Sequence, residues 1–367
     1  MKKGFTTGSC AAAASKAAAM LLLGGSCMEH ISIQTPAGEE YCPKVLEKNR
    51  GGDFASCAIR KESGDDPDIT NHTLIFAKVS FGKQNEGRSV VIDGGEGIGR
   101  VTRPGLDQPV GNAAINSVPR QMIEKEVTEV MELFDYNGSL QVEIYAPEGK
   151  SLGEKTFNPR LGIEGGISII GTTGIVEPMS TKALLDTIKT ELCQKKAMGT
   201  EVAVISPGNY GLDFMKNHYG YDLDQAVKCA NYIGDTIDMA IEAGFQKILL
   251  CGHIGKLIKV SGGIMNTHSK EADCRMELMM TAALQSGADT KSMQRILSCV
   301  STEEAIGVME EEEIKEKSFA YIMDRIGFYL KKRGGENADV RCIVYSNQYG
   351  LLGETKDAHL FLNEQKG

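Results

Sequence analysis

The sequence predicts two domains: an α+β domain over residues 1–160, then a Rossmann-like α/β domain over residues 161–367 with a mainly parallel, doubly wound sheet. The length of 367 residues exceeds that of a typical single core. Three apolar, strand-like runs each stop at a Gly-x-x-Gly and resume with helical periodicity, at residues 167–174, 202–211 and 248–255. A strand, a glycine turn and a helix form the repeating unit of an open α/β sheet, which binds ligands at the carboxyl ends of its strands.

The first domain is expected to begin with an Ala-rich helix over residues 10–23. Thr7 or Ser9 is the expected N-cap, because a hydroxyl can accept from the first free N–H groups, and the two glycines that follow Leu23 end the helix. Short apolar runs then predict strands, and Pro119 opens a second helix. These further elements are strands at 31–35, 41–46, 55–60, 73–81, 89–92 and 140–145 and a helix at 119–133.

The second domain follows a plausible hinge at residues 158–160. Its strands alternate with long helices, which is typical of a parallel sheet with helices on both faces. The acidic run 310–313 is interpreted as a solvated helix start, where carboxylates complement the helix dipole. The remaining elements are helices at 180–196, 223–242 and 272–284 and a late strand at 340–345.

Composition and charge argue against several classes of function. The formal net charge of −9 argues against nucleic acid as the main partner, because phosphate contacts need a dominant basic face. The ten cysteines include no Cys-x-x-Cys pair, which favours reduced thiols in a cytoplasmic protein and predicts no protein-bound metal. No stretch approaches the apolar length that spans a bilayer, and Lys16 interrupts the N-terminal Ala/Leu stretch, so we expect a helix there rather than a secretory signal.

The glycine-rich segment 93–118 offers a first candidate for cofactor binding. Residues 93–99 spell Asp-x-Gly-x-Gly-x-Gly, the pattern of the cofactor loop in Rossmann-type methyltransferases that use S-adenosylmethionine (SAM). A helix should follow at once, but Arg100, Arg103 and Pro104 come instead, so a large structured loop is at least as good an interpretation. The segment is not a dinucleotide fingerprint, because that pattern needs a glycine where Arg100 stands.

Two basic segments suggest recognition of an anion. Residues 243–270 contain four lysines and two histidines without one Asp or Glu, around the glycine loop that holds His253. The loop 97–120 adds three arginines against one aspartate, and arginine forks suit carboxylates. The alternatives are solvated lysines on helix faces and a loop pinned by internal salt bridges. No Ser/His/acid grouping and no His-Glu-x-x-His is present, so the residues fit an enzyme that works mainly by positioning.

A family resemblance extends over both predicted domains. The segments that carry it are 4–14 (GFTTGSCAAAA), 93–99 (DGGEGIG), 101–106 (VTRPGL), 114–120 (AINSVPR), 166–178 (GISIIGTTGIVEP), 208–213 (GNYGLD), 252–257 (GHIGKL) and 262–268 (GGIMNTH). Together they strongly resemble the cobalt-precorrin-5B C-1 methyltransferases, the CbiD family. Ser117, where the family often has Pro, is a small departure.

The resemblance implies transfer of a methyl group from SAM to C-1 of a cobalt-containing corrinoid in the oxygen-independent route to cobalamin, with cobalt carried by the substrate. The acetate and propionate groups of such a ring would explain clustered Arg and Lys on an acidic protein. The expected catalytic residues are His253 first, then His268 and Asp213. The expected cofactor-binding residues are Gly171, Thr172, Thr173, Gly174, Gly208, Asn209, Gly211, Asp93, Gly95 and Gly97. The expected substrate-binding residues are Arg100, Arg103, Arg120, Asn112, Asn116, Lys256 and Lys259.

Several alternatives stay open at the level of the sequence. The domain context favours residues 171–174 and 208–211 as the SAM loops, whereas the Asp-x-Gly-x-Gly-x-Gly pattern favours residues 93–99. We expect SAM at 171–174 and 208–211, with loop 93–120 closing over the corrinoid. A nucleotide- or nicotinamide-dependent oxidoreductase could use the same cleft, although residues 205–207 offer no acid for a ribose. A non-catalytic tetrapyrrole-binding protein would bind the ring and ignore SAM. Assembly into a homo-oligomer is also left open.

Overall fold

The computed structural model describes the whole chain except residues 1, 27, 83–86, 179, 209–211 and 365–367. The chain divides into two compact units, residues 1–181 and residues 182–367. The division therefore falls after Thr181, whereas the sequence placed a hinge at 158–160. The segment that follows this hinge belongs to the first unit.

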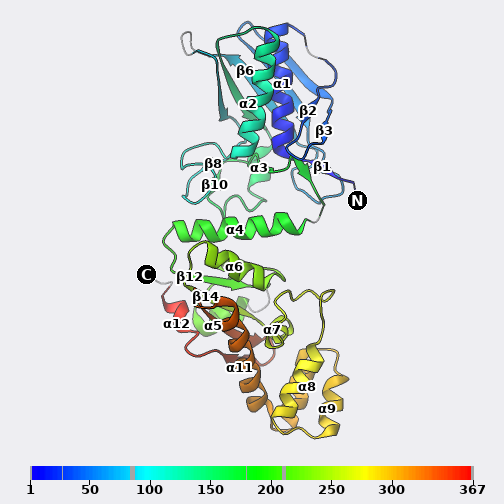
Figure 1. Ribbon diagram of the computed structural model, residues 1–367, viewed down its shortest axis with the longest axis vertical. Coiled ribbons are helices and arrows are strands. Elements are labelled where there is room, and N and C mark those ends of the chain that lie inside the picture. The colour runs from blue at the N-terminus through cyan, green and yellow to red at the C-terminus, as the bar shows by residue number, and fades with distance from the viewer. Residues whose placement is uncertain (1, 27, 83–86, 179, 209–211, 365–367) are drawn as a thin grey trace. The chain divides into compact units, whose positions relative to one another are not determined.

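The first unit is built on a five-stranded sheet with two helices on one face (Figure 1). Neighbouring strands are antiparallel except for the last pair, which is parallel. The helices are α1 (Thr7–Gly24) and α2 (Ser117–Leu133). In sheet order the strands are β4 (Val45–Arg50), β5 (Phe54–Arg60), β6 (Leu74–Phe81), β9 (Ser139–Tyr145) and β7 (Ser89–Gly94).

Helix α1 packs closely because alanines line it. Seven alanines between Ala11 and Ala19 have no exposed surface, so the helix can approach both the sheet and α2. The hydroxyl of Thr6 accepts from the N–H of Ser9 and caps the helix, one residue earlier than the sequence suggested. Gly25 ends the helix in the left-handed conformation, with φ of 76°.

Short strand pairs complete the first unit and correct the prediction for residues 167–174. Residues 167 and 169 form only isolated bridges, to Ile98 and Ile115, and the next helix does not begin until Thr181. Residues 175–176 instead form a strand that pairs with the N-terminal strand, which fixes this loop against α1. The pairs are β1 (Gly4–Phe5) with β11 (Ile175–Val176), β2 (Ile33–Gln34) with β3 (Glu40–Tyr41), and β8 (Arg100–Val101) with β10 (Ile163–Glu164); α3 (Gly149–Gly153) is a single turn.

The second unit contains a five-stranded sheet between two apolar cores. Its strands, in sheet order, are β13 (Val227–Lys228), β12 (Val202–Ser206), β14 (Lys247–His253), β15 (Asp339–Ser346) and β16 (Gly350–Glu354). The first four are parallel and β16 is antiparallel to β15. One core contains α4 (Thr181–Ala197), α6 (Ile233–Glu242), α7 (Ile254–Ser261) and α11 (Lys315–Gly334), and the other contains α5 (Leu212–Tyr219) and α12 (Leu360–Asn363).

Two predicted helices differ in the structure. Residues 223–242 do not form one helix: a 3₁₀ turn (Leu223–Gln225) and β13 precede α6, because Ile205 and Ser206 of β12 take β13 as a parallel partner. The acidic run 310–313 lies at the end of α10 (Thr302–Glu311), not at a helix start, and Glu313 adopts a left-handed φ of 56°. The other helices are α8 (Arg275–Gln285) and α9 (Thr290–Leu297).

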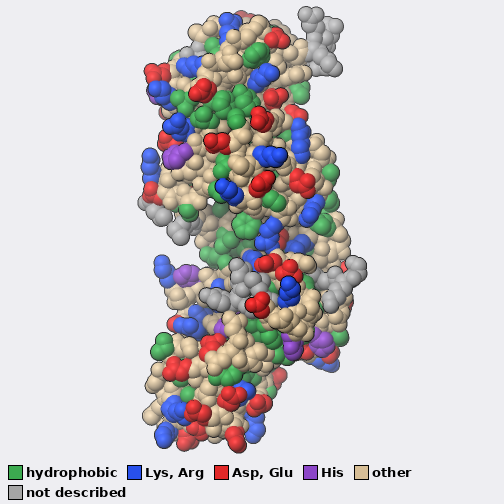
Figure 2. All heavy atoms as spheres, turned by 180° about the vertical axis from the view of Figure 1, so that it is seen from behind, with side chains coloured by type: hydrophobic (Ala, Val, Ile, Leu, Met, Phe, Trp, Pro, Cys, Tyr) green, Lys and Arg blue, Asp and Glu red, His purple; other side chains and the backbone are tan. Residues whose placement is uncertain are grey.

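The surface mixes both signs of charge. Figure 2 shows Lys and Arg side chains interspersed with Asp and Glu over the visible face of each unit. Within the described ranges, no helix combines the length and the apolarity needed to cross a bilayer.

Candidate functional site

The parallel strands of the second unit end together at one edge of the sheet. β12 ends at Ser206, β14 at His253 and β15 at Ser346, and Pro207 follows β12 directly. Of the four parallel strands, β12 comes first in the chain and lies between the second (β13) and the third (β14). The strand order therefore reverses between β12 and β14, and open α/β sheets bind their ligands at the carboxyl ends of strands at such a point.

Lys256 lies at this reversal point. Its side chain, from the first turn of α7, donates from Nζ to the carbonyl oxygens of Pro207 (2.6 Å) and Ala230 (3.4 Å). Ala230 follows β13 and holds a left-handed φ of 49°, which is uncommon for a residue other than glycine. Burial lowers the pKa of the Lys256 ammonium, and among the described residues no carboxylate lies within ion-pair distance to oppose that shift.

His253 caps helix α7 and is held at both ring nitrogens. Nδ1 accepts from the N–H of Gly255 (3.1 Å), and Nε2 lies 2.9 Å from Oε1 of Glu303. An Nδ1 that accepts requires the proton on Nε2, so the ring donates to Glu303. Burial lowers the pKa of His253 while Glu303 opposes the shift. The ring therefore links the first turn of α7 to Glu303 in its neutral form, and its predicted catalytic role stays a prediction.

Glu303 is a site residue that sequence reasoning missed. Its carboxylate accepts from the hydroxyls of Thr302 (2.9 Å) and Ser346 (3.2 Å) as well as from His253. It joins the first turn of α10 to the ends of β14 and β15. The local sequence shows only an acidic first turn after the N-cap Ser301, so no signal indicated a partner 50 residues earlier.

The other predicted residues of the second unit do not join this network. Lys259 is 3% exposed and donates to the carbonyl oxygens of Thr267 (3.1 Å) and Ala272 (2.7 Å), so it holds the following loop rather than a ligand. His268 is exposed and accepts from the N–H of Lys270, and Asp213 is exposed in the first turn of α5. No hydrogen bond or ion pair between described residues joins His253, His268 and Asp213.

The predicted glycine loop 208–211 lies mostly outside the described residues. Asn209 and Gly211 fall there, so their predicted roles stay predictions. Gly208 is described, and its carbonyl oxygen accepts from the hydroxyl of Ser206 (2.9 Å).

In the first unit, loop 93–120 is pinned by its own contacts, the alternative that the sequence left open. Asp93 pairs with Arg100 at 2.8 Å and 3.0 Å. Burial would raise the pKa of Asp93, but Arg100 and the N–H of Gly94 outweigh it and hold the pKa below its usual range. Arg120 donates to the carbonyl oxygens of Ile92 and Ile115, both at 2.8 Å. Of the remaining candidates, Arg103 and Asn112 are exposed and Asn116 is the N-cap residue of α2.

The glycines of this loop make close backbone approaches to the protein itself. A Cβ on Gly95 would lie 2.7 Å from the carboxylate of Glu143, and one on Gly97 would lie 1.8 Å from the carbonyl oxygen of Ala146. Packing within the first unit therefore requires glycine at 97, where the neighbour is backbone, whereas at Gly95 the neighbour is the end of the Glu143 side chain, which can move. Their predicted contact with a cofactor has no support in this geometry.

Residues 171–174 are held against the first turn of α1. Ser9 donates to the carbonyl oxygen of Gly174 (2.7 Å), Thr6 donates its N–H to the same oxygen (3.1 Å), and Gly8 donates its N–H to Ile170 (3.1 Å). A hydroxyl of Thr173 bonds within its own turn, and Thr172 is exposed. The carbonyl oxygen of Gly174 therefore bonds to the first turn of α1, and the predicted contact of residues 171–174 with SAM stays a prediction.

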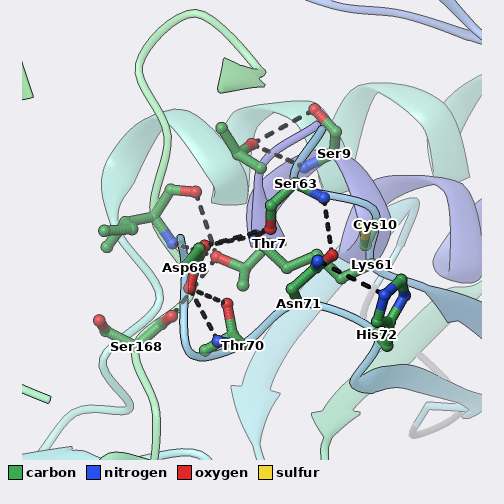
Figure 3. Close-up of polar contacts among 12 residues, drawn as sticks. Thr7, Ser9, Cys10, Lys61, Ser63, Asp68, Thr70, Asn71, His72 and Ser168 are labelled. Atoms are coloured by element: carbon green, nitrogen blue, oxygen red, sulfur yellow. Dashed lines mark hydrogen bonds and ion pairs between the residues drawn. The ribbon is translucent and has the colours of Figure 1, made fainter. Parts of the chain in front are cut away.

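A buried ion pair supports the same region. Lys61, 1% exposed, donates to Asp68 and to Ser63, both at 2.5 Å, and Asp68 also accepts from Thr70 (Figure 3). Burial would raise the pKa of Asp68, but Lys61 and Thr70 lower it. Among the described residues, no group of three or more His, Cys, Asp and Glu side chains is arranged to hold a metal ion.

Comparison with known proteins identifies relatives along most of the chain. Residues 1–178 match the family model described as CbiD, and residues 266–356 match the one described as CbiD, C-terminal domain. The cobalt-precorrin-5B C(1)-methyltransferase of Ruminiclostridium cellulolyticum is 44% identical over 95% of this chain and 89% of its own length. The protein of the same name from Treponema denticola is 44% identical over 96% of each chain.

A solved structure is also similar. The crystal structure of a cobalamin biosynthesis protein (cbiD) from Archaeoglobus fulgidus is 26% identical, with 74% of this chain and 84% of that chain covered. Its TM-score of 0.40 is too low to support a comparison of the folds.

Proposed function

The chain belongs to the CbiD family, and we propose that it is an enzyme of cobalamin biosynthesis that transfers a methyl group from SAM to C-1 of cobalt-precorrin-5B. The observation that carries this proposal is the identity of 44% over nearly the full length of proteins named for that reaction. Cobalt would arrive with the substrate, and the reaction would take place in the cytoplasm.

The chemistry needs alignment more than acid or base groups. An electron pair of the macrocycle at C-1 displaces the sulfur, so a carbon–carbon bond forms as the carbon–sulfur bond of SAM breaks. The donor leaves as S-adenosylhomocysteine. The positive charge of the sulfonium passes to the macrocycle and is removed with a proton. SAM is already activated, so orientation and exclusion of water supply most of the rate.

We place the donor at the carboxyl edge of the second unit, which we assign to the doubly wound α/β class. The strand reversal between β12 and β14 supports this placement, as does a lysine without a carboxylate partner among the described residues. The candidates in the first unit, 93–97 and 171–174, are occupied by contacts within the chain.

The experiment that tests the function uses the purified full-length chain. Thermal unfolding is measured without ligand and with SAM, S-adenosylhomocysteine or NADH. A ligand that binds only the native state at a hundredfold excess over Kd stabilises it by about 2.7 kcal/mol. We expect SAM and its product to raise the unfolding temperature and NADH to leave it unchanged.

Methyl transfer is then followed directly by incubating the chain with cobalt-precorrin-5B and SAM labelled in the methyl group. The expected result is label in the corrinoid and S-adenosylhomocysteine in equal amounts. A shift with NADH alone would replace the proposal by an oxidoreductase. Corrinoid binding without any label transfer would replace it by a carrier.

A further inference from the structure

We propose that Lys256 is the residue that binds the carboxylate of the methyl donor's amino-acid group. The inference rests on the proposed function, because it assumes that SAM is the donor. It adds the residue and the ligand group that fix the orientation of the donor at the carboxyl edge of the second unit.

The first argument is the unused bonding capacity of Lys256. An ammonium has three N–H donors and a full positive charge. Two carbonyl oxygens, of Pro207 and Ala230, accept from Nζ, and carbonyls carry no charge to balance it. A half-buried cation of this kind is costly unless an anion pairs with it, and no described carboxylate does.

The second argument is position. Lys256 comes from the helix after β14, and its ammonium contacts Pro207 after β12 and Ala230 after β13. This one side chain therefore links the ends of three neighbouring strands. The contacts span the point where the strand order reverses, the place at which such sheets receive ligands. The left-handed Ala230 turns its carbonyl toward this point at a cost in backbone strain.

The neighbouring lysine of the same helix shows the contrast. Lys259 also donates to two carbonyl oxygens, but its side chain is 4% exposed and Asp273 lies 3.9 Å from its Nζ. It has both a nearby carboxylate and no access for a ligand. Lys256 is more exposed and has no carboxylate partner among the described residues, so of these two lysines it has the chemistry of an anion site.

The test compares two ligands that differ by the proposed group. S-adenosylhomocysteine carries the amino-acid carboxylate, whereas 5′-methylthioadenosine lacks the whole amino-acid group. Binding of each is measured by isothermal titration calorimetry to the wild-type chain, to Lys256→Gln and to Lys270→Met. The amide of Gln keeps a donor for the carbonyl oxygens and removes the charge. Lys270, an exposed lysine of the same cation-rich segment, is the matched control.

We expect Lys256→Gln to weaken the binding of S-adenosylhomocysteine about 10- to 100-fold, because a charge-assisted hydrogen bond is lost at a half-buried site. The Kd of methylthioadenosine should differ by less than about threefold between the wild-type chain and Lys256→Gln. Lys270→Met should bind both ligands as tightly as the wild type does. Lys256→Met serves as the second variant, and thermal unfolding without ligand shows whether each variant is folded.

The outcomes separate this inference from the proposed function. An equal loss of affinity for both ligands in Lys256→Gln would show that Lys256 only maintains the structure of the site, which would overturn the inference. No loss of affinity for either ligand would overturn it as well. Neither result would affect methyl transfer by the wild-type chain, which tests the function separately. A wild-type chain that transfers methyl but binds the two ligands equally well would place the carboxylate away from Lys256. A wild-type chain that binds and transfers nothing would overturn both proposals.

Discussion

Gly97 allows a direct test of whether the glycine-rich loop of the first unit serves packing or a cofactor. Its φ of 73° is left-handed, and a Cβ there would lie 1.8 Å from the carbonyl oxygen of Ala146. The backbone also bonds at this point, since its carbonyl oxygen accepts from the N–H of Ile167 (3.0 Å). Gly97→Ala therefore forces either the loop or the turn after β9 to move.

The expected cost has two parts. An alanine in the left-handed region costs about 1–2 kcal/mol. Forcing the clash with Ala146 to relax costs about 1–3 kcal/mol more, as overpacking does in well-packed interiors. The sum is a loss of about 2–5 kcal/mol in the free energy of unfolding. Gly111→Ala is the matched control, because its φ of 92° is also left-handed but nothing lies within 4 Å of the new Cβ. This variant should therefore lose only about the 1–2 kcal/mol that the left-handed backbone costs an alanine.

The assay is urea denaturation followed by circular dichroism, with hydrogen exchange of peptides from α1 reporting on the first unit. SAM binding is measured on both variants at a temperature where they are folded. The packing argument would be refuted if Gly97→Ala were as stable as Gly111→Ala. Equal stability with loss of SAM binding would return Gly97 to the cofactor role that its sequence pattern suggested.

Two further changes test the buried polar groups. Asp68→Asn leaves the ammonium of Lys61 buried without a carboxylate, so the free energy of unfolding measured in urea should fall by about 3–5 kcal/mol. Adding Lys61→Met should recover most of that loss, and a double variant that recovers nothing would contradict the ion-pair argument. His253 has a lowered pKa in the folded chain, so the unfolded chain binds more protons and wild-type stability should fall as the pH drops below about 6.5. His253→Asn keeps an N-cap and removes this titration, so its free energy of unfolding should change less between pH 7.5 and 5.5; an unchanged pH dependence would show that His253 is not the group responsible.

Local patterns were enough for much of the secondary structure. The Ala-rich stretch predicted helix α1, because a run of small helix formers bounded by Thr and Gly has few other conformations. Short apolar runs placed β5, β6 and β9 within one residue, since each of these strands contributes side chains to the same core. The single helix predicted over residues 223–242 was wrong, because the pairing of β13 with β12 overrides the helical periodicity of the sequence there.

The motifs that resemble a family were also visible in the chain, and they correctly indicated the CbiD family. The roles of the individual residues were not visible, because each depends on partners distant in sequence. Ser9 meets Gly174, 165 residues away, and His253 meets Glu303, 50 residues away. A glycine pattern is the same whether the close neighbour is a cofactor or another backbone segment. The sequence likewise does not distinguish Lys259, which has Asp273 nearby, from Lys256, which has no carboxylate partner among the described residues. Hydrogen bonding and charge compensation act through space, so folding assigns these roles to residues that the sequence alone leaves equivalent.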